Sequence, residues 1–132
     1  MRLQVALFIL VLFICFAHFY GIANGLYWSK WWYDIPMHAL GGAFIAGLYV
    51  HIFNRRMRWP EHKHYSTVLH AVAFVALVGV LWEMYELWAD VYYNKIYSLN
   101  SFPGAVHFDT LLDLFNDIWG GAIGVLVARK LK

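Results

Sequence analysis

Four apolar stretches constrain the fold of this 132-residue chain more than any other feature. A helix that crosses a bilayer needs about 20 mostly apolar residues, and we predict such helices at about residues 3–20, 33–53, 68–89 and 109–128. The chain is 62% hydrophobic and 14% charged, whereas a soluble domain is about 45–50% apolar and about 25% charged. The sequence therefore predicts an all-α integral membrane protein, in which residues 1–132 form a single domain, a bundle of four transmembrane helices.

Basic residues are distributed unevenly around the predicted spans. Eight of the ten Lys and Arg residues lie at the two termini and in the connection around residues 54–67, and only Lys30 and Lys95 lie elsewhere. By the positive-inside rule, the basic side is cytoplasmic. We therefore predict that both termini are cytoplasmic and that the protein resides in a prokaryotic inner membrane. Because topology explains the basic residues, no nucleic-acid partner is expected.

Acidic residues gather on the opposite side. Seven of the eight lie toward the outer ends of the last three predicted helices: Asp34, Glu83, Glu86, Asp90, Asp109, Asp113 and Asp117. Within each helix their spacing of three or four residues places them on one face, and His38 joins Asp34 on its face. An ionised carboxylate inside hydrocarbon costs about 2.5–3.5 kcal/mol or more. The sequence therefore predicts that the three faces meet in a polar cavity.

Glycines continue two of these faces toward the cytoplasmic side. Gly41 and Gly42 follow His38, and Gly120 and Gly124 follow Asp117 with the spacing Gly-x-x-x-Gly. Small residues at this spacing let two helix backbones approach closely. We expect tightly packed helices beneath the acidic residues.

A divalent metal ion is the first candidate ligand for the cavity. Carboxylate oxygens with one imidazole suit Mg²⁺, Mn²⁺, Ca²⁺ or Zn²⁺, and the sequence implies no organic cofactor. The predicted metal ligands are His38, Glu83, Glu86, Asp113 and Asp117. The residues expected at the rim are Asp34, Asp90 and Asp109 at helix ends, and His107 in the outer connection.

Two other uses of the acidic residues stay open at this point. Neighbouring carboxylates raise one another's pKa and can share protons, as proton or cation translocation requires. Alternatively, the polar groups join helices in a structural or assembly subunit, although such interhelical pairs contribute only about 0.6–2 kcal/mol each. No hydrolase motif assigns a catalytic residue, so the sequence does not decide whether the protein is an enzyme. Membrane lipids are the expected partners, and a second copy or another membrane protein stays open.

The order of motifs resembles a known group of small polytopic membrane proteins. The motifs are Tyr33-Asp34-x-x-x-His38, Trp82-Glu83-x-x-Glu86 and Asp109-Thr110-x-x-Asp113-x-x-x-Asp117-x-x-Gly120-Gly121-x-x-Gly124. Over residues 33–128 they are similar to the VanZ-like group and to the related YjdF-like inner-membrane family. Ile35 stands where the VanZ-like pattern has Lys, and the paired acids of the third helix are closer to the YjdF-like form. The resemblance implies a cell-envelope role like that of VanZ-like proteins, which are linked to lowered sensitivity to a glycopeptide antibiotic.

Overall fold

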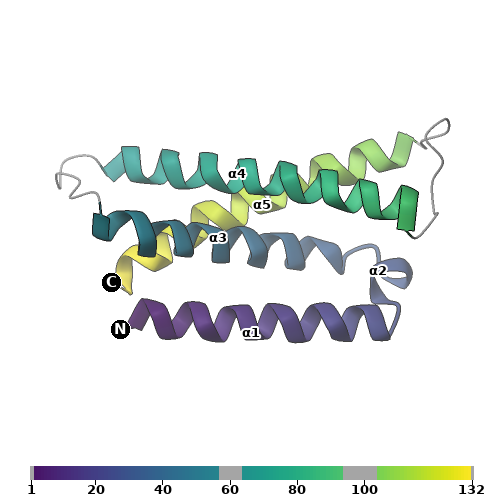
Figure 1. The fold of residues 1–132 in the computed structure, drawn as a ribbon, viewed down its shortest axis with the longest axis horizontal. Helices are drawn as coiled ribbons and strands as arrows, with labels where there is room; N and C mark the ends of the chain where they lie inside the picture. Colours follow the sequence, from purple (N-terminus) through teal and green to yellow (C-terminus); the bar gives the residue numbers. More distant parts are fainter. Residues whose placement is uncertain (1, 57–63, 94–103, 132) are drawn as a thin grey trace.

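The structure, a computed structural model, describes residues 2–56, 64–93 and 104–131. Its helices are α1 (Arg2–Ala23), α2 (Leu26–Ser29), α3 (Asp34–Arg56), α4 (His64–Trp88), the π-helical turn η1 (Ala89–Tyr93) and α5 (Gly104–Lys130), shown in Figure 1. No strand occurs in these ranges. Four of the helical segments are long and apolar enough to cross a membrane. The predicted four-helix membrane bundle is thereby confirmed.

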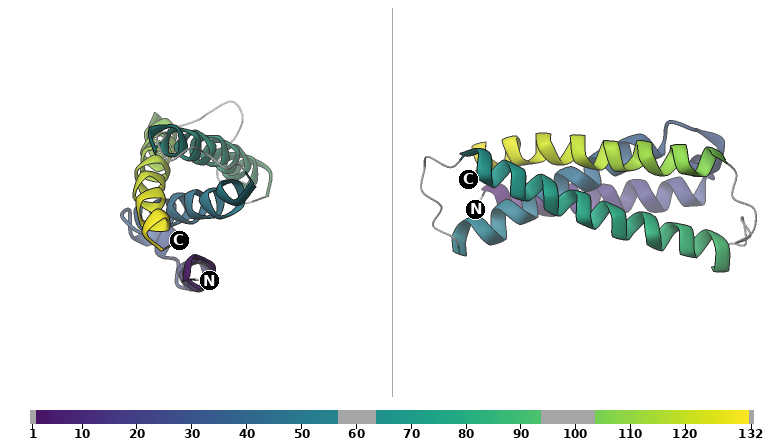
Figure 2. Two further views of the ribbon diagram at one scale, coloured as in Figure 1. Left: turned by 90° about the vertical axis from the view of Figure 1, so that its left-hand side faces the viewer. Right: turned by 90° about the horizontal axis from the view of Figure 1, so that it is seen from above.

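The long helices are not equivalent in the bundle. Viewed from one end, α3, α4 and α5 surround a common centre, whereas α1 lies outside them beside α3 (Figure 2). The most extensive contact is between α3 and α5. Both termini lie at the same end of the molecule (Figure 1), as an even number of spans requires. The site therefore has to be sought among the three central helices and on the face that α1 covers.

Several helix boundaries differ from the predicted ones. α1 continues beyond residue 20 to Ala23, α4 begins at His64 and α5 begins at Gly104. The predicted boundaries followed apolar side chains, whereas a helix continues wherever its backbone hydrogen bonds do. The short α2 was not predicted. It follows Gly25, which adopts the left-handed conformation (φ 63°) that commonly ends a helix such as α1.

Glycines let α3 and α5 approach to backbone contact. A Cβ atom on Gly42 would collide with the carbonyl oxygen of Asp117, and one on Gly120 would collide with the carbonyl oxygen of Ala39. A Cβ on Gly124 would come within 2.6 Å of Ala43 Cα. The predicted close packing is confirmed at Gly42, Gly120 and Gly124 and fixes Asp117 relative to α3, but it is wrong for Gly41, where an added Cβ meets no atom within 4 Å.

The helix α1 is attached to the bundle near both of its ends. Near the termini, Leu7 packs so closely that a Cβ on Gly47 would lie 2.7 Å from Leu7 Cδ2. At the other end, the Tyr33 hydroxyl donates a 2.7 Å hydrogen bond to the carbonyl oxygen of Ala17, and the Tyr33 ring occupies the space that a side chain at Gly21 would need. The middle of α1 spans the gap between these two attachments.

The buried apolar core lies on the side of the termini. Its members are small or branched: Leu3, Leu7, Ala46, Val50, Ala71, Val75, Val125 and Ala128. Large aromatic side chains are exposed at the opposite end, with Trp31 82% and Tyr93 81% exposed. Such amphipathic rings prefer the membrane–water interface. The bundle is therefore closed by apolar packing at one end and ringed by aromatic side chains at the other.

Candidate functional site

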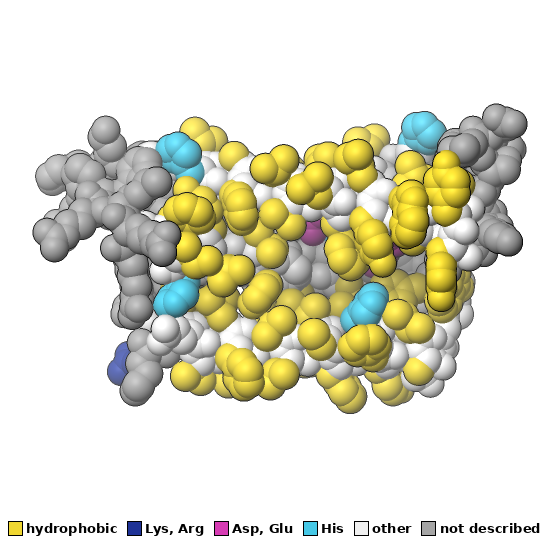
Figure 3. Space-filling model, in the orientation of Figure 1, with side chains coloured by type: hydrophobic (Ala, Val, Ile, Leu, Met, Phe, Trp, Pro, Cys, Tyr) yellow, Lys and Arg dark blue, Asp and Glu magenta, His cyan; other side chains and the backbone are white. Residues whose placement is uncertain are grey.

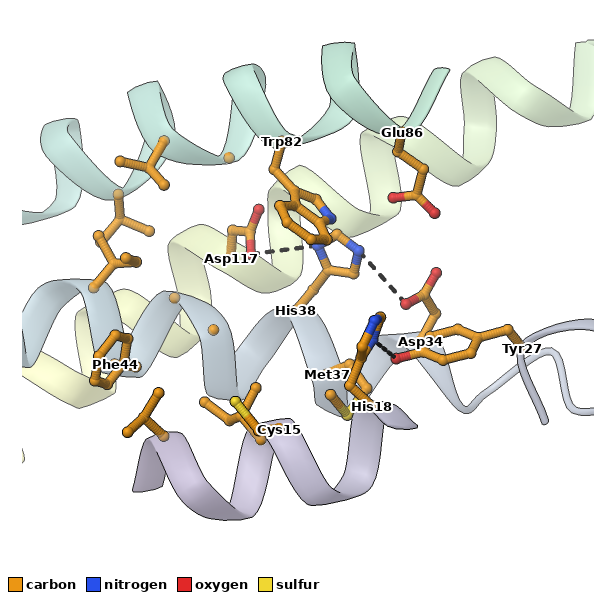
Figure 4. A pocket seen from close by; sticks show the side chains of 18 of the residues that line it. Cys15, His18, Tyr27, Asp34, Met37, His38, Phe44, Trp82, Glu86 and Asp117 are labelled. Carbon is orange, nitrogen blue, oxygen red and sulfur yellow. Dashed lines mark hydrogen bonds and ion pairs between the residues drawn. The ribbon is translucent and has the colours of Figure 1, made fainter. Parts of the chain in front are cut away.

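The imidazole of His38 lies at the centre of a cluster of four carboxylates. Its Nε2 atom is 3.6 Å from Asp34 Oδ1, 3.8 Å from Glu83 Oε1 and 3.9 Å from Asp113 Oδ1. Its Nδ1 atom is 3.4 Å from Asp117 Oδ1. Figure 4 shows this ring between Asp34 and Asp117, with Glu86 above. One imidazole thus has carboxylates at both of its nitrogens.

Helical spacing on three helices produces this geometry. On α3, Asp34 lies one turn before His38, and on α5, Asp113 lies one turn before Asp117, so each pair shares a face. Glu83 comes from α4. The residues are withdrawn from the surface, with His38 only 6% and Asp113 only 4% exposed. The close α3–α5 contact therefore brings together two faces that the chain separates by many residues.

The distances around His38 are those of ion pairs and are longer than direct hydrogen bonds. A hydrogen bond from an imidazole N–H to oxygen spans about 2.7–3.2 Å, which is shorter than the 3.4–3.9 Å found around His38. Two ligands that each lie about 2.2 Å from an ion, at angles of about 90–109°, are about 3.1–3.6 Å apart. The Asp117 and Asp34 distances of 3.4 Å and 3.6 Å fall within that range, and the other two are longer. Two sets of residues bring their potential ligand atoms together, Asp34–His38–Asp113 and His38–Glu83–Glu86. Within each set, these atoms lie within 4.8 Å of one another, so each set forms a group that could hold a metal ion.

Two oxygens of the cluster are buried without a hydrogen-bond partner in the described part of the chain. They are Glu83 Oε1 and Asp117 Oδ2. The space around Asp117 Oδ2 depends on Gly79, because a Cβ at that position would lie 2.5 Å from the oxygen. A buried polar group without a partner is costly. Both oxygens therefore need a cation, a proton or a hydrogen-bond donor.

A cavity of about 380 Å³ opens beside the cluster. Asp34, His38, Glu86 and Asp117 line its polar part, whereas Glu83 and Asp113 do not line it. Apolar side chains of α1, α3 and α4 form the remaining walls, among them Val11, Ile14, Phe44, Ile45, Val75 and Val78. Two carboxylates of the cluster, those of Asp34 and Asp117, therefore line the cavity together with His38. The other two, those of Glu83 and Asp113, do not.

A second polar pair lines the same cavity on the side of α1. His18 Nδ1 and the Tyr27 hydroxyl are 2.8 Å apart and share a hydrogen bond. Burial, followed by the nearby Asp34 carboxylate, raises the pKa of the Tyr27 phenol well above its ordinary value. Tyr27 therefore keeps its proton at neutral pH and remains a hydrogen-bond donor at the cavity wall.

The structure brings most of the predicted site residues together. Of the predicted ligands, His38, Glu83, Asp113 and Asp117 form the cluster, and Glu86 joins a ligand set with His38 and Glu83. Asp34, which was predicted at the rim, begins α3 and lies 3.6 Å from His38 with its side chain 26% exposed. Its position at a helix end suggested the rim, and its i, i+4 relation to His38 places both side chains on one face.

The other predicted rim residues lie outside the cluster. Asp90 is half-buried in η1, and Asp109 and His107 are exposed. The sequence reasoning missed Gly79 and Tyr27. Gly79 precedes Glu83 by four residues and so lies on the same face of the helix. This spacing could have identified Gly79 from the sequence. Nothing in the sequence indicated that Tyr27 faces the cavity, because its position depends on α2.

Comparison with known protein families identifies the family to which the chain belongs. The family described as predicted membrane protein, DUF2238, matches residues 1–132. The chain belongs to this family. Its four spans agree with that description, and the family assignment does not extend to the VanZ-like or YjdF-like groups. No curated protein and no solved structure matches the chain.

Proposed function

We propose that this DUF2238 protein binds a divalent cation at the His38 cluster and there binds or acts on a lipid-linked or envelope component. The observation that supports the proposal is the arrangement of carboxylates from α3, α4 and α5 around one imidazole, with potential ligand atoms within 4.8 Å of one another in each of two residue sets. Hard oxygen ligands with a single nitrogen suit Mg²⁺, Mn²⁺, Ca²⁺ or Zn²⁺.

The charge of the cluster also supports a bound cation. Its four carboxylates belong to Asp34, Glu83, Asp113 and Asp117, Glu86 lies beside them, and His38 is the basic group that faces the cluster. Ionised groups in a membrane interior are tolerated when they are paired or coordinated. A divalent cation would neutralise two of these charges and would supply a ligand partner for Glu83 Oε1, which accepts no hydrogen bond from the described residues.

The packing beneath the cluster favours binding over passage through the membrane. Val50, Val75 and Val125 are fully buried on the side of the termini, and a Cβ on Gly121 would already lie 3.0 Å from the Val75 methyl groups. A continuous route for protons or cations needs polar groups or water along its whole length. The buried core in the described inner half of a single copy consists instead of close apolar contacts.

Element analysis tests the cation site directly. We expect protein purified in mild detergent without chelator to hold about one divalent ion per chain. Glu83→Gln and Asp113→Asn should each lower the affinity by about 10-fold or more, because each replaces a charged ligand with a neutral amide. Isothermal titration with Mn²⁺ and Zn²⁺ after chelator treatment measures this loss.

Asp109→Asn is the matched control for Asp113→Asn. Asp109 lies on the same helix one turn away, but it is exposed, so its replacement should leave the affinity unchanged. Wild-type protein that holds no stoichiometric ion and binds none after titration would contradict the proposed cation site. So would equal losses in the Asp109 and Asp113 variants.

Orientation is proposed from the basic residues and can be measured with cysteine labelling. In a Cys15→Ser background, we expect Lys30→Cys to react with a membrane-impermeant maleimide in intact cells, because the side with fewer basic residues faces outward. Lys130→Cys should react only after permeabilisation. Both positions are exposed and lie at opposite ends of the bundle. The reverse pattern would place the cluster in the cytoplasmic half of the membrane.

A further inference from the structure

We propose that the cavity beside the His38 cluster admits the hydrocarbon chain of an amphiphile from the bilayer, through the gap between α1 and α4, and binds its hydrogen-bond-donating polar group at Asp117. This inference names the ligand class of the proposed functional site. It rests on the cluster being a binding site, but not on which cation the cluster holds.

The position of the opening points to the bilayer as the source of the ligand. α1 packs against α2 and α3 and makes no extensive contact with α4 among the described residues. Because α1 is attached near its two ends, its middle forms a wall of the cavity through Val11 and Ile14. In Figure 3, an acidic side chain is visible in the hollow between the two helices that border this face. These helices are membrane-spanning segments, so hydrocarbon surrounds the opening.

The lining of the cavity matches an amphiphile. Its volume of about 380 Å³ falls within the range of about 300–1,000 Å³ that is typical of small-molecule sites. Most of the wall is aliphatic or aromatic, from Ile14 on α1 to Phe44 on α3 and Val78 on α4. The polar groups are confined to one region, formed by the cluster and by the His18–Tyr27 pair. An amphiphile has the same separation, because it carries its polar group at one end of an apolar hydrocarbon chain.

Asp117 defines the chemistry of the polar end. Its side chain is 10% exposed, its Oδ1 faces His38, and its buried Oδ2 has no hydrogen-bond partner in the described chain. The residue lines the cavity, and its Oδ2 lies buried beside Gly79, which lines the same cavity. A carboxylate oxygen accepts hydrogen bonds, and Asp34 and Glu86 beside it are also acidic. The site therefore selects a hydroxyl or an amine and repels an anionic carboxylate or phosphate end.

Gly41 offers a way to fill the cavity without disturbing the helices. It lines the cavity, and a Cβ added there meets no atom within 4 Å. We expect Gly41→Leu to occupy the ligand space while α3 still packs against α5. Val78→Trp narrows the same space from α4 and serves as a second variant should Gly41→Leu fail to fold. Leu77→Trp is its control, because the neighbouring Leu77 is 57% exposed to the lipid side.

The test is photolabelling of the full chain in lipid nanodiscs with three probes of equal chain length. They are a long-chain alcohol, a long-chain amine and a fatty acid, each with a diazirine near the end of the chain. We expect the alcohol and the amine to label residues 11–15 and 75–79 at least about 10-fold more than the fatty acid does, a difference of about 1.4 kcal/mol. Gly41→Leu and Val78→Trp should abolish this labelling, and Gly41→Ala and Leu77→Trp should retain it.

The outcomes separate this proposal from the cation site. Equal labelling by the fatty acid, or labelling unaffected by both cavity-filling variants in folded protein, would overturn the amphiphile site. Labelling that persists in chelator and in Glu83→Gln would support it even if no cation were found, because Glu83 does not line the cavity. Conversely, a protein that binds Mn²⁺ but shows no probe selectivity would retain the cation site and lose the amphiphile.

Discussion

Gly42→Ala is expected to destabilise the bundle strongly, whereas Gly41→Ala one position earlier should not. A Cβ at position 42 collides with the backbone carbonyl of Asp117, and one at position 41 meets open space. Overpacking of this kind costs about 1–3 kcal/mol, and occasionally more, and here the obstacle is a backbone that cannot rotate away. Reversible unfolding in mixed micelles, followed by circular dichroism, measures the difference.

The pair of variants isolates the collision from the change in helix propensity. Both substitutions replace glycine by alanine within α3, which by itself stabilises a helix by about 0.5–1 kcal/mol. Gly41→Ala should therefore unfold at the same free energy as the wild type or a slightly higher one. Gly42→Ala should also weaken Mn²⁺ binding, because it displaces the α5 backbone at Asp117. Equal stability of the two variants would show that α3 and α5 do not approach as described.

His38→Ala is expected to abolish cation binding and to lower the free energy of unfolding. Nε2 faces the carboxylates of Asp34, Glu83 and Asp113, so removal of the ring takes away the shared ligand and the basic partner. Breaking a buried charge pair by deleting one member costs about 3–5 kcal/mol. Titration with Mn²⁺ and unfolding of the same preparation measure both losses.

His107→Ala is the control for this substitution. His107 lies at the same end of the bundle on α5, but its side chain is exposed and lies outside the cluster. We expect neither its affinity for Mn²⁺ nor its stability to change. A His38 variant that binds the cation as the wild type does would exclude the imidazole as a ligand. It would leave the carboxylates as the only candidates.

The predicted site came close to the observed cluster because acidic residues in apolar helices are informative. His38, Glu83, Asp113 and Asp117 were identified from their helical spacing, since residues three or four positions apart share a face. Asp34 was placed at the rim because a helix end suits an acidic residue electrostatically. That argument considered the helix end alone, whereas Asp34 both begins α3 and shares a helix face with His38.

The sequence by itself determined the membrane class, the four candidate spans and the acidic helix faces. These properties follow from hydrophobicity and from the 3.6-residue period, which are local to each helix. Only the tertiary structure decided that α3 and α5 touch through Gly42 and Gly120 and that α1 stands away from α4. Contacts between helices depend on shape complementarity between distant segments, which no local pattern encodes. The same packing produced the cavity and buried Asp117 Oδ2 without a hydrogen-bond partner in the described part of the chain.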